Sequence, residues 1–303
     1  PLIVCDETVA ELCKQYYPDL SMIEKDPLHL ELPSKIVCCE PARLVQATFP
    51  FAKIDQFFWL PHGNSDKGWK KPYFRALQVE TALVYGQKMV DLFEKQNIQI
   101  PQLRIGNFRL NYWERHRNFY DRILDKTDWF DPSKRIYLYA PTWDDAESNS
   151  SFCSFSSRLF EVVPKDCLLL VKIHPNMQKQ NIAKLEQLQG CLPTSDHIQF
   201  IDLFPPIYPL LDRCHAYIGD MSSIGYDFLY WNRPMYFFNP HPASSKTDPS
   251  LFLYRCGKEA ALDSIESIFL QHEDPLPLLE LRKQIYDYTF DRSPEYGSRL
   301  PFA

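Results

Sequence analysis

The chain has 303 residues, of which 45% are hydrophobic and 24% charged, as in an ordinary soluble globular protein of one or two domains. The formal charge of −6 argues against a nucleic-acid polymer or a polybasic membrane anchor as the main partner, whereas a small anionic ligand needs only a local basic patch. No signal peptide is apparent and no apolar run approaches the ~18 residues of a membrane helix, so a cytoplasmic protein is expected.

Short β-branched or aromatic runs alternate with amphipathic stretches along the first half of the chain. This pattern predicts strands at 2–5, 35–39, 56–60, 81–85 and 103–105. It predicts helices at 7–16, 41–48, 86–96 and 111–125. A polar, proline-bearing stretch follows at 126–134, and we interpret it as a linker.

The second half repeats the alternation. Strands are predicted at 135–140, 168–173, 198–201, 216–219 and 235–238. Helices are predicted at 154–162, 177–189, 207–213, 222–231, 258–271 and 276–290. Alternation of this kind is typical of parallel sheets with helices on both faces. We therefore expect two α/β domains, residues 1–130 and 131–303, with a last helix that packs back on the first domain.

The nine cysteines are scattered, and no C-x-x-C occurs among them. Several stand in apolar runs, as in "IVCCE" and "DCLLLV". We expect reduced, buried thiols, as in a cytoplasmic protein. The vicinal pair Cys38–Cys39 is interpreted as core packing, with a redox role as the alternative.

Polar clusters follow four of the predicted strands, at the sheet edge where parallel α/β folds bind their ligands. They are "PHGNSDKGW" after 56–60, "PTWDD" after 135–140, His174–Pro175 after 168–173, and "DMSSIGYD" after 216–219. Two of the four contain a histidine. Together they predict a ligand cleft between the domains.

The stretch "IGDMSSIGYDF" predicts a strand that ends at Gly219 and a helix that begins near Ser222 or Ser223. Serines at a helix start cap free backbone N–H groups. The same N–H groups and the helix dipole suit a phosphate, and an ordinary N-cap explains this motif alone equally well. No G-x-G-x-x-G and no P-loop is present, which disfavours both nucleotide fingerprints.

His62 stands between Pro61 and Gly63, which fix the turn and let a ligand approach the backbone. The nearby Asp66 is a candidate to orient the imidazole. Lys67 and the basic residues after it bring positive charge that suits a phosphate-bearing substrate. The alternative is a solvated, lysine-rich loop.

Arg109 follows a predicted strand and is expected in the cleft, while His241 in "NPHP" is a reserve candidate. The histidines and cysteines lack the spacing of a zinc site. The acids of "WDDAE" suit a divalent cation, but a helix N-terminus explains them equally well, so no metal and no certain cofactor are assigned. No G-x-S-x-G is present, which disfavours an α/β-hydrolase.

Five stretches stand out as a set: "PHGNSDKG", "IGNFR", "YAPTW", "VKIHP" and "YPLLDRCHAYIGDMSSIGYDFLYWNRPMYFF". Together they resemble the CDP-glycerol glycerophosphotransferase family of teichoic-acid and capsule polymerases and primases. The resemblance runs from about residue 56 to 240 and is strongest over 135–240. It implies a glycosyltransferase-B fold, with two Rossmann-like domains, an active site in the cleft between them, and a CDP-activated polyol as donor.

The resemblance also implies residue roles. The two catalytic histidines of the family fall on His62 and His174. Its phosphate-binding serines fall on Ser222 and Ser223, and the adjacent acid on Asp220. Thr142, Lys172 and Pro175 are assigned to the same donor site. Lys67, Arg109 and Gly63 are assigned to the acceptor or to phosphate.

Two positions depart from the family pattern: Asp144 replaces an arginine after A-P-T-W, and Met221 replaces a tyrosine before the paired serines. We also expect the family's long membrane-binding N-terminal part to be absent or minimal. The predicted function is transfer of a polyol phosphate from a CDP-polyol to a phosphate-bearing or glycan acceptor in cell-envelope or capsule synthesis, with peripheral contact at the inner membrane face left open. The alternatives are a nucleotide-sugar glycosyltransferase or epimerase of the same fold, and a nucleotide-binding relative without catalysis.

Overall fold

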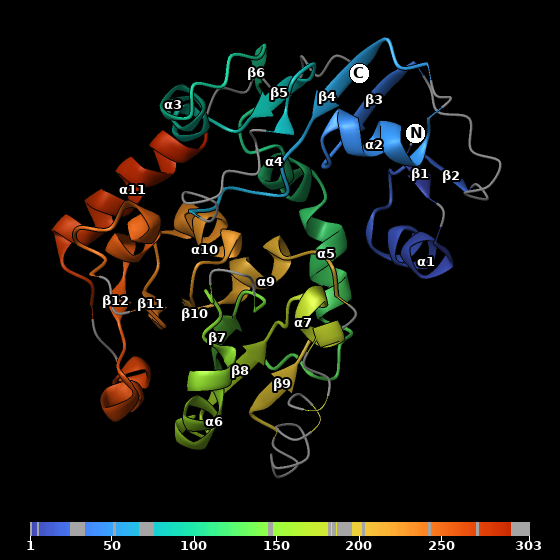
Figure 1. Ribbon diagram of the computed structural model, residues 1–303. Coiled ribbons are helices and arrows are strands. Elements are labelled where there is room, and N and C mark those ends of the chain that lie inside the picture. The colour runs from blue at the N-terminus through green and yellow to red at the C-terminus, as the bar shows by residue number, and fades with distance from the viewer. Residues whose placement is uncertain are drawn as a thin grey trace.

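The protein is described from a computed structural model that covers most of the chain. The described residues are 2–4, 6–24, 34–50, 53–66, 76–144, 148–180, 183, 186, 196–201, 204–241, 244–270 and 273–291. They form one sheet of two strands, one of four and one of six (Figure 1). Every strand pair among them is parallel. The predicted α/β class with parallel sheets is therefore confirmed.

The four-stranded sheet has the order β3-β4-β5-β6. Its strands are β3 (Lys35–Cys38), β4 (Gln56–Trp59), β5 (Thr81–Val84) and β6 (Gln102–Arg104). The helices of this half are α1 (Glu7–Tyr16), α2 (Ala42–Thr48) and α3 (Gln87–Lys95). The separate pair is β1 (Leu2–Val4) with β2 (Met22–Glu24), and β2 was not predicted.

The six-stranded sheet has the order β12-β11-β10-β7-β8-β9. Its strands are β7 (Arg135–Ala140), β8 (Cys167–Val171), β9 (Ile198–Phe200), β10 (Ala216–Gly219), β11 (Met235–Phe237) and β12 (Lys258–Glu259). The strand order reverses between β7 and β10, which pair directly. Open α/β sheets bind ligands outside the strand ends at such a switch point, so the loops after β7 and β10 are the first places to look for a site.

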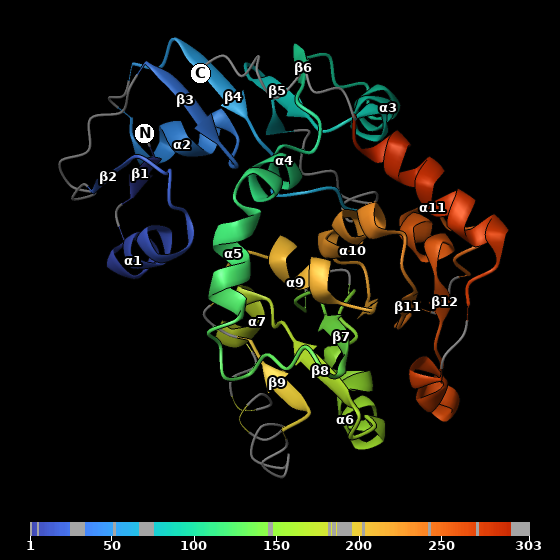
Figure 2. The ribbon, with the colours of Figure 1, turned by 180° about the vertical axis from the view of Figure 1, so that it is seen from behind.

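Helices cover both faces of this larger sheet (Figures 1 and 2). The α-helices after β6 are α4 (Phe108–Arg115), α5 (Arg117–Leu124), α6 (Phe152–Val162), α7 (Pro175–Gln180), α9 (Tyr208–Arg213), α10 (Ser223–Phe228) and α11 (Leu276–Thr289). The 3-10 helices are η3 (Leu229–Trp231), η4 (Pro249–Cys256) and η5 (Leu262–Phe269).

Two predicted helices differ from the structure. The helix expected at 111–125 is two helices that meet at His116, whose backbone is non-helical. The first begins earlier than expected because the Asn107 side chain accepts the Leu110 N–H and caps it. The helix expected at 258–271 is wrong: Lys258 and Glu259 pair with β11, and a 3-10 helix follows. Strand pairing with β11 has overridden the local amphipathic pattern there.

Helix α11 lies along helices of both halves of the molecule, against α3 on one side and η3 and η4 on the other (Figures 1 and 2). Tyr288 donates to Asp91 at 2.7 Å, and Arg104 pairs with Asp291 at 2.7 and 2.8 Å. The C-terminal end of α11 is thus fixed to the four-stranded half. The division into domains at residue 130 stays a prediction.

Seven cysteines fall within the described residues, and all seven are free thiols. Four are buried, as predicted: Cys13, Cys167, Cys214 and Cys256. Cys38 and Cys39 are half-buried and Cys153 is exposed, so the expectation of buried thiols does not hold for these three. Within the described ranges, no helix combines the length and the apolarity needed to cross a membrane.

Gly106 generates a stability prediction. Its φ is +63°, and an added Cβ would stand 2.7 Å from the Asp291 carbonyl oxygen at the end of α11. Gly106→Ala should therefore lower the free energy of unfolding by about 1–3 kcal/mol, measured by urea denaturation. Val79→Ala, at an exposed position, is the control. Equal stability of the two variants would contradict this packing of α11.

Candidate functional site

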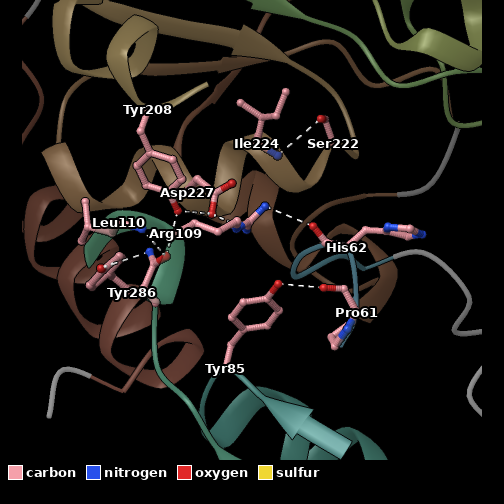
Figure 3. Close-up of polar contacts among 11 residues, drawn as sticks. Pro61, His62, Tyr85, Arg109, Leu110, Tyr208, Ser222, Ile224, Asp227 and Tyr286 are labelled. Carbon is pink, nitrogen blue, oxygen red and sulfur yellow. Dashed lines mark hydrogen bonds and ion pairs between the residues drawn. The ribbon is translucent and has the colours of Figure 1, made fainter. Parts of the chain in front are cut away.

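The turn after β4 is held by side chains from the ends of two neighbouring elements (Figure 3). The Tyr85 hydroxyl donates to the Pro61 carbonyl at 2.7 Å. Arg109 Nη1 donates to the His62 carbonyl at 3.1 Å. The backbone of the turn is therefore fixed at two consecutive residues, Pro61 and His62. The His62 imidazole is exposed and points away from these contacts.

Gly63 brings this turn against the first residue of α10. An added Cβ on Gly63 would stand 3.0 Å from Ser223 Cβ and 3.1 Å from Ser223 Oγ. Only a residue without a side chain leaves this approach open. The histidine turn of the four-stranded half and the serine pair of the six-stranded half thus meet, while the ligand cleft between two domains stays a prediction.

Ser222 is the N-cap of α10. Its Oγ accepts the Ile224 N–H at 3.4 Å, and the residue is 8% exposed. The capping interpretation of this motif is therefore correct for Ser222. Ser223 is half-buried and faces Gly63 across the contact described above.

Arg109 forms an ion pair with Asp227 of α10, with Nη2 and Oδ1 2.8 Å apart. The Asp227 side chain is 1% exposed and that of Arg109 25%. The Tyr208 hydroxyl donates to the same carboxylate oxygen at 2.9 Å. Burial is the largest effect on the pKa of Arg109 and would lower it, but Asp227 together with Tyr85, Tyr208 and Tyr17 outweighs burial and raises the pKa, so the guanidinium stays charged. Burial raises the pKa of Asp227, against the opposing effects of Arg109 and Tyr208.

Asp66 anchors the same turn to α10 and η4. Its carboxylate lies 3.0 Å from Lys88 Nζ, accepts the Tyr226 hydroxyl at 2.6 Å and accepts the Leu253 N–H at 3.0 Å. Both carboxylate oxygens are occupied by these groups. The expectation that Asp66 orients the His62 imidazole is therefore wrong. Lys67 and the basic residues after it lie outside the described residues.

The loops after β7 and β10 are tied together by Asp220, which is fully buried. Asp220 Oδ1 accepts the Thr142 N–H at 2.8 Å. Its Oδ2 accepts the Ser151 N–H and hydroxyl, each at 2.8 Å. This carboxylate is turned toward groups of its own chain, and it fixes the loop that carries Thr142 next to the serine pair.

His174 forms a second group with Trp143. The two rings are stacked, with centroids 6.3 Å apart and planes at 30°. His174 Nδ1 accepts the Asn176 N–H at 3.1 Å. In the neutral imidazole the proton then sits on Nε2.

The other predicted donor-site residues flank His174. Lys172 Nζ donates to the Ile201 carbonyl at 3.3 Å, which places the ammonium group beside the end of β9. Pro175 is exposed and is the first residue of α7. The structure thus joins His62, Gly63, Arg109 and the two serines in one cluster, and His174 with Trp143 in another at the same edge of the six-stranded sheet.

Tyr85 and Tyr208 contribute to the site without having been predicted. Tyr85 directly follows β5, and burial raises its pKa to about 12. The sequence pattern placed Tyr85 inside the predicted strand 81–85, whereas the strand ends at Val84, so the strand-end rule did not select it. Tyr208 begins a helix, and no signal in the sequence identified it.

No metal site emerges from the part of the chain that the structure describes: there, no three His, Cys, Asp or Glu side chains gather closely enough to hold an ion. Of the acids in "WDDAE", Asp145 and Glu147 lie outside the described residues. The reserve candidate His241 has Nε2 2.8 Å from Asn149 Oδ1. It lines an open hollow of about 420 Å³ with Asn239 and Glu259, at the ends of β11 and β12.

Residues 112–248 match the family model described as CDP-Glycerol:Poly(glycerophosphate) glycerophosphotransferase. The matched segment contains the motifs after β7, β8 and β10, whereas the His62 turn precedes it. The teichoic acid glycerol-phosphate primase of Bacillus subtilis (strain 168) is 29% identical over 106 residues, which are 35% of this chain and 26% of the primase. The match therefore spans about a quarter of that relative's length. The resemblance indicated by the motifs is confirmed.

Three solved structures resemble this chain over most of its length. The wall teichoic acid polymerase TagF has a TM-score of 0.56 at 15% identity, over 98% of this chain and 86% of its own. S. aureus MnaA in a co-structure with UDP has a TM-score of 0.57 at 11% identity, over 96% and 84%. The UDP-GlcNAc 2-epimerase from Neisseria meningitidis has a TM-score of 0.52 at 12% identity, over 88% and 73%. At these identities the likeness shows the fold alone, and the predicted glycosyltransferase-B architecture is confirmed.

The hydrogen bonds of Asp220 generate a prediction that separates a structural role from ligand binding. Asp220→Ala removes the acceptor of three hydrogen bonds and leaves two buried N–H groups unpaired. We expect the free energy of unfolding to fall by about 2–4 kcal/mol without any ligand, measured by chemical denaturation. Asp144→Ala, at an exposed position in the same loop, is the control. An Asp220→Ala variant as stable as this control would contradict the structural role and favour direct contact of Asp220 with the donor.

Proposed function

We propose, from the match of residues 112–248 to the CDP-glycerol glycerophosphotransferase family, that this chain transfers a polyol phosphate from a CDP-activated donor to an acceptor hydroxyl. The acceptor is phosphate-bearing or a glycan, as in the synthesis of a cell-envelope or capsule polymer. The proposal includes a cytoplasmic location with peripheral contact at the inner membrane face. The observation that carries it is the approach of Gly63 to Ser223, which sets an exposed histidine beside a serine pair at a sheet switch point.

The donor binds with its pyrophosphate at the start of α10. There the Ser223 hydroxyl and the Ser223 N–H are the hydrogen-bond donors, since the Ile224 N–H is bonded to Ser222 Oγ and the Gly225 N–H to the Ser222 carbonyl. His174, which follows β8, contributes a further hydrogen bond to the pyrophosphate, as the family resemblance implies. These donors are fixed before the reaction and stabilise the negative charge that builds on the leaving CMP.

The acceptor oxygen attacks the β-phosphorus of the donor. The bond from that phosphorus to the bridging oxygen breaks, and its electron pair leaves with CMP. The proton of the acceptor hydroxyl passes to His62, because an exposed imidazole on a fixed turn is suited to general-base catalysis. No covalent intermediate with the enzyme is required.

Four predicted donor-site residues act indirectly in this proposal. Asp220 and the Thr142 backbone hold the loop after β7, which keeps Trp143 stacked on His174. Pro175 restrains the backbone that follows His174, since its ring fixes φ. Lys172 adds positive charge at the end of β8.

Phosphorus-31 NMR on the wild-type protein tests the reaction. With CDP-glycerol and a glycerol-phosphate-terminated acceptor, we expect CMP and a new phosphodiester signal in equal amounts. A UDP-sugar glycosyltransferase would release an intact nucleoside diphosphate. An epimerase, the function of one of the structural neighbours by its name, would leave the pyrophosphate of a UDP-sugar unbroken. CMP-free turnover of a UDP-sugar would overturn the proposal.

The two histidines should fail differently when each is replaced by alanine. His62→Ala should bind CDP-glycerol about as well as wild type and lose turnover by about 10²–10⁴-fold, as expected for a general base. His174→Ala should weaken donor binding as well as turnover, because its hydrogen bond to the pyrophosphate is present in both ground and transition states.

Calorimetry with CDP-glycerol and initial rates of CMP release provide the two measurements. His215→Asn is the control, since His215 precedes β10 at the opposite edge of the sheet and asparagine can still accept the Ile136 N–H. Normal turnover by His62→Ala would remove the base assignment and leave His62 as a turn residue.

A further inference from the structure

We propose that Arg109 is a positioning residue: its guanidinium joins the His62 turn to α10 and so sets the placement of His62 relative to Ser223. The sequence had assigned Arg109 to the acceptor or to a substrate phosphate. The inference rests on the proposed function for its catalytic consequence, and on geometry alone for the coupling between the two segments.

Both terminal nitrogens of Arg109 are engaged, and they face different elements (Figure 3). Nη1 donates to the His62 carbonyl at 3.1 Å, and Nη2 donates to Asp227 Oδ1 at 2.8 Å. The donors of a guanidinium lie in a rigid planar fork. The distance between the His62 carbonyl and the Asp227 carboxylate is therefore set by one rigid group.

Tyr85 supports the same arrangement from below the guanidinium. The Arg109 guanidinium lies over the Tyr85 ring, 5.5 Å from its centroid. The hydroxyl of that tyrosine holds the Pro61 carbonyl at 2.7 Å. One side chain thus supports Arg109 and fixes the residue before His62, so the turn and the guanidinium cannot shift independently.

Asp227 is fixed in turn by the start of α4, which carries Arg109. Tyr208 OH lies 2.9 Å from Asp227 Oδ1 and 2.8 Å from Asn107 Oδ1. Asn107 is the N-cap of α4, through its contact with the Leu110 N–H at 3.2 Å. These contacts close a ring from α4 through Tyr208 and Asp227 back to Arg109, which holds α10 to α4 at two points.

The Arg109 guanidinium is poorly suited to binding a substrate phosphate, because its charge and both of its terminal nitrogens already have partners in the protein. Its charge is compensated at 2.8 Å by a carboxylate that is 1% exposed. Its Nε is buried and has no hydrogen-bond partner among the described residues, so this nitrogen is closed to solvent although the side chain as a whole is 25% exposed. The geometry therefore favours a role through His62 over direct contact with the substrate.

Arg109→Lys and Asp227→Asn test the kinetic consequence. A lysine keeps the charge but reaches only one of the two partners, and asparagine removes the charge of Asp227. Since a misplacement of about 1 Å costs on the order of 10²-fold in rate, we expect each variant to lose about 10–100-fold in kcat for CMP release, with the KM for CDP-glycerol within about threefold of wild type. The double variant should be no slower than the worse single variant, because both break one link.

A phosphate-binding Arg109 would behave differently. Asp227→Asn would then release the guanidinium, keep kcat and lower KM, whereas Arg109→Lys would raise KM. That pattern would overturn the proposal. Arg115→Lys, at an exposed position on the same helix, is the matched control and should leave both parameters unchanged.

Hydrogen–deuterium exchange tests the coupling without any turnover. In Arg109→Lys and in Asp227→Asn, the amides of 62–66 and of 223–228 should both exchange at least about fivefold faster, while Arg115→Lys matches wild type. Faster exchange in only one segment, or in neither, would refute the coupling. If the coupling is found but the wild type releases no CMP from any CDP-polyol, the proposed function fails and the positioning contact stands.

Discussion

The arrangement of the site depends on one buried carboxylate, Asp66, which joins the histidine turn to the six-stranded half. It is compensated by Lys88 at 3.0 Å and by two further donors, Tyr226 and the Leu253 N–H. Removing one partner of a buried pair typically costs about 3–5 kcal/mol, whereas an apolar replacement of the whole group is often tolerated. The contacts of Asp66 therefore serve mainly to fix how the histidine turn packs against α10 and η4, and contribute little net stability. The approach of Gly63 to Ser223 follows from this packing.

This anchoring divides the motif "PHGNSD" into two kinds of residue. The Pro61 and His62 carbonyls, the Ser65 carbonyl and the Asp66 carboxylate are all bound by the protein itself. The His62 imidazole is what remains exposed. A motif can thus mark chemistry although most of its atoms serve to hold one side chain in place.

Much of the fold and the location of the site could be predicted from the sequence. Hydrophobic alternation predicted the parallel sheets, and the strand-end rule selected His62, His174 and the serines, which do follow β4, β8 and β10. The side-chain partners could not be predicted, because Arg109 and Asp227 are 118 residues apart and Asp66 and Tyr226 are 160. Local pattern carries no information on such pairs, and it also failed at Lys258, where pairing with β11 decided the structure.

Unsatisfied polar groups are unevenly distributed over the described residues. Nine buried side-chain atoms have no hydrogen-bond partner, and four of them belong to the site: both polar atoms of Asn64, Arg109 Nε and Asp227 Oδ2. Each such group costs about 1–3 kcal/mol when it stays unpaired, and native proteins pair most of them with protein or ordered water. Two of these four atoms belong to the His62 turn and two to the ion pair that joins α4 to α10. The contacts of Asp66 and Arg109 that fix His62 thus leave these atoms without a partner among the described residues.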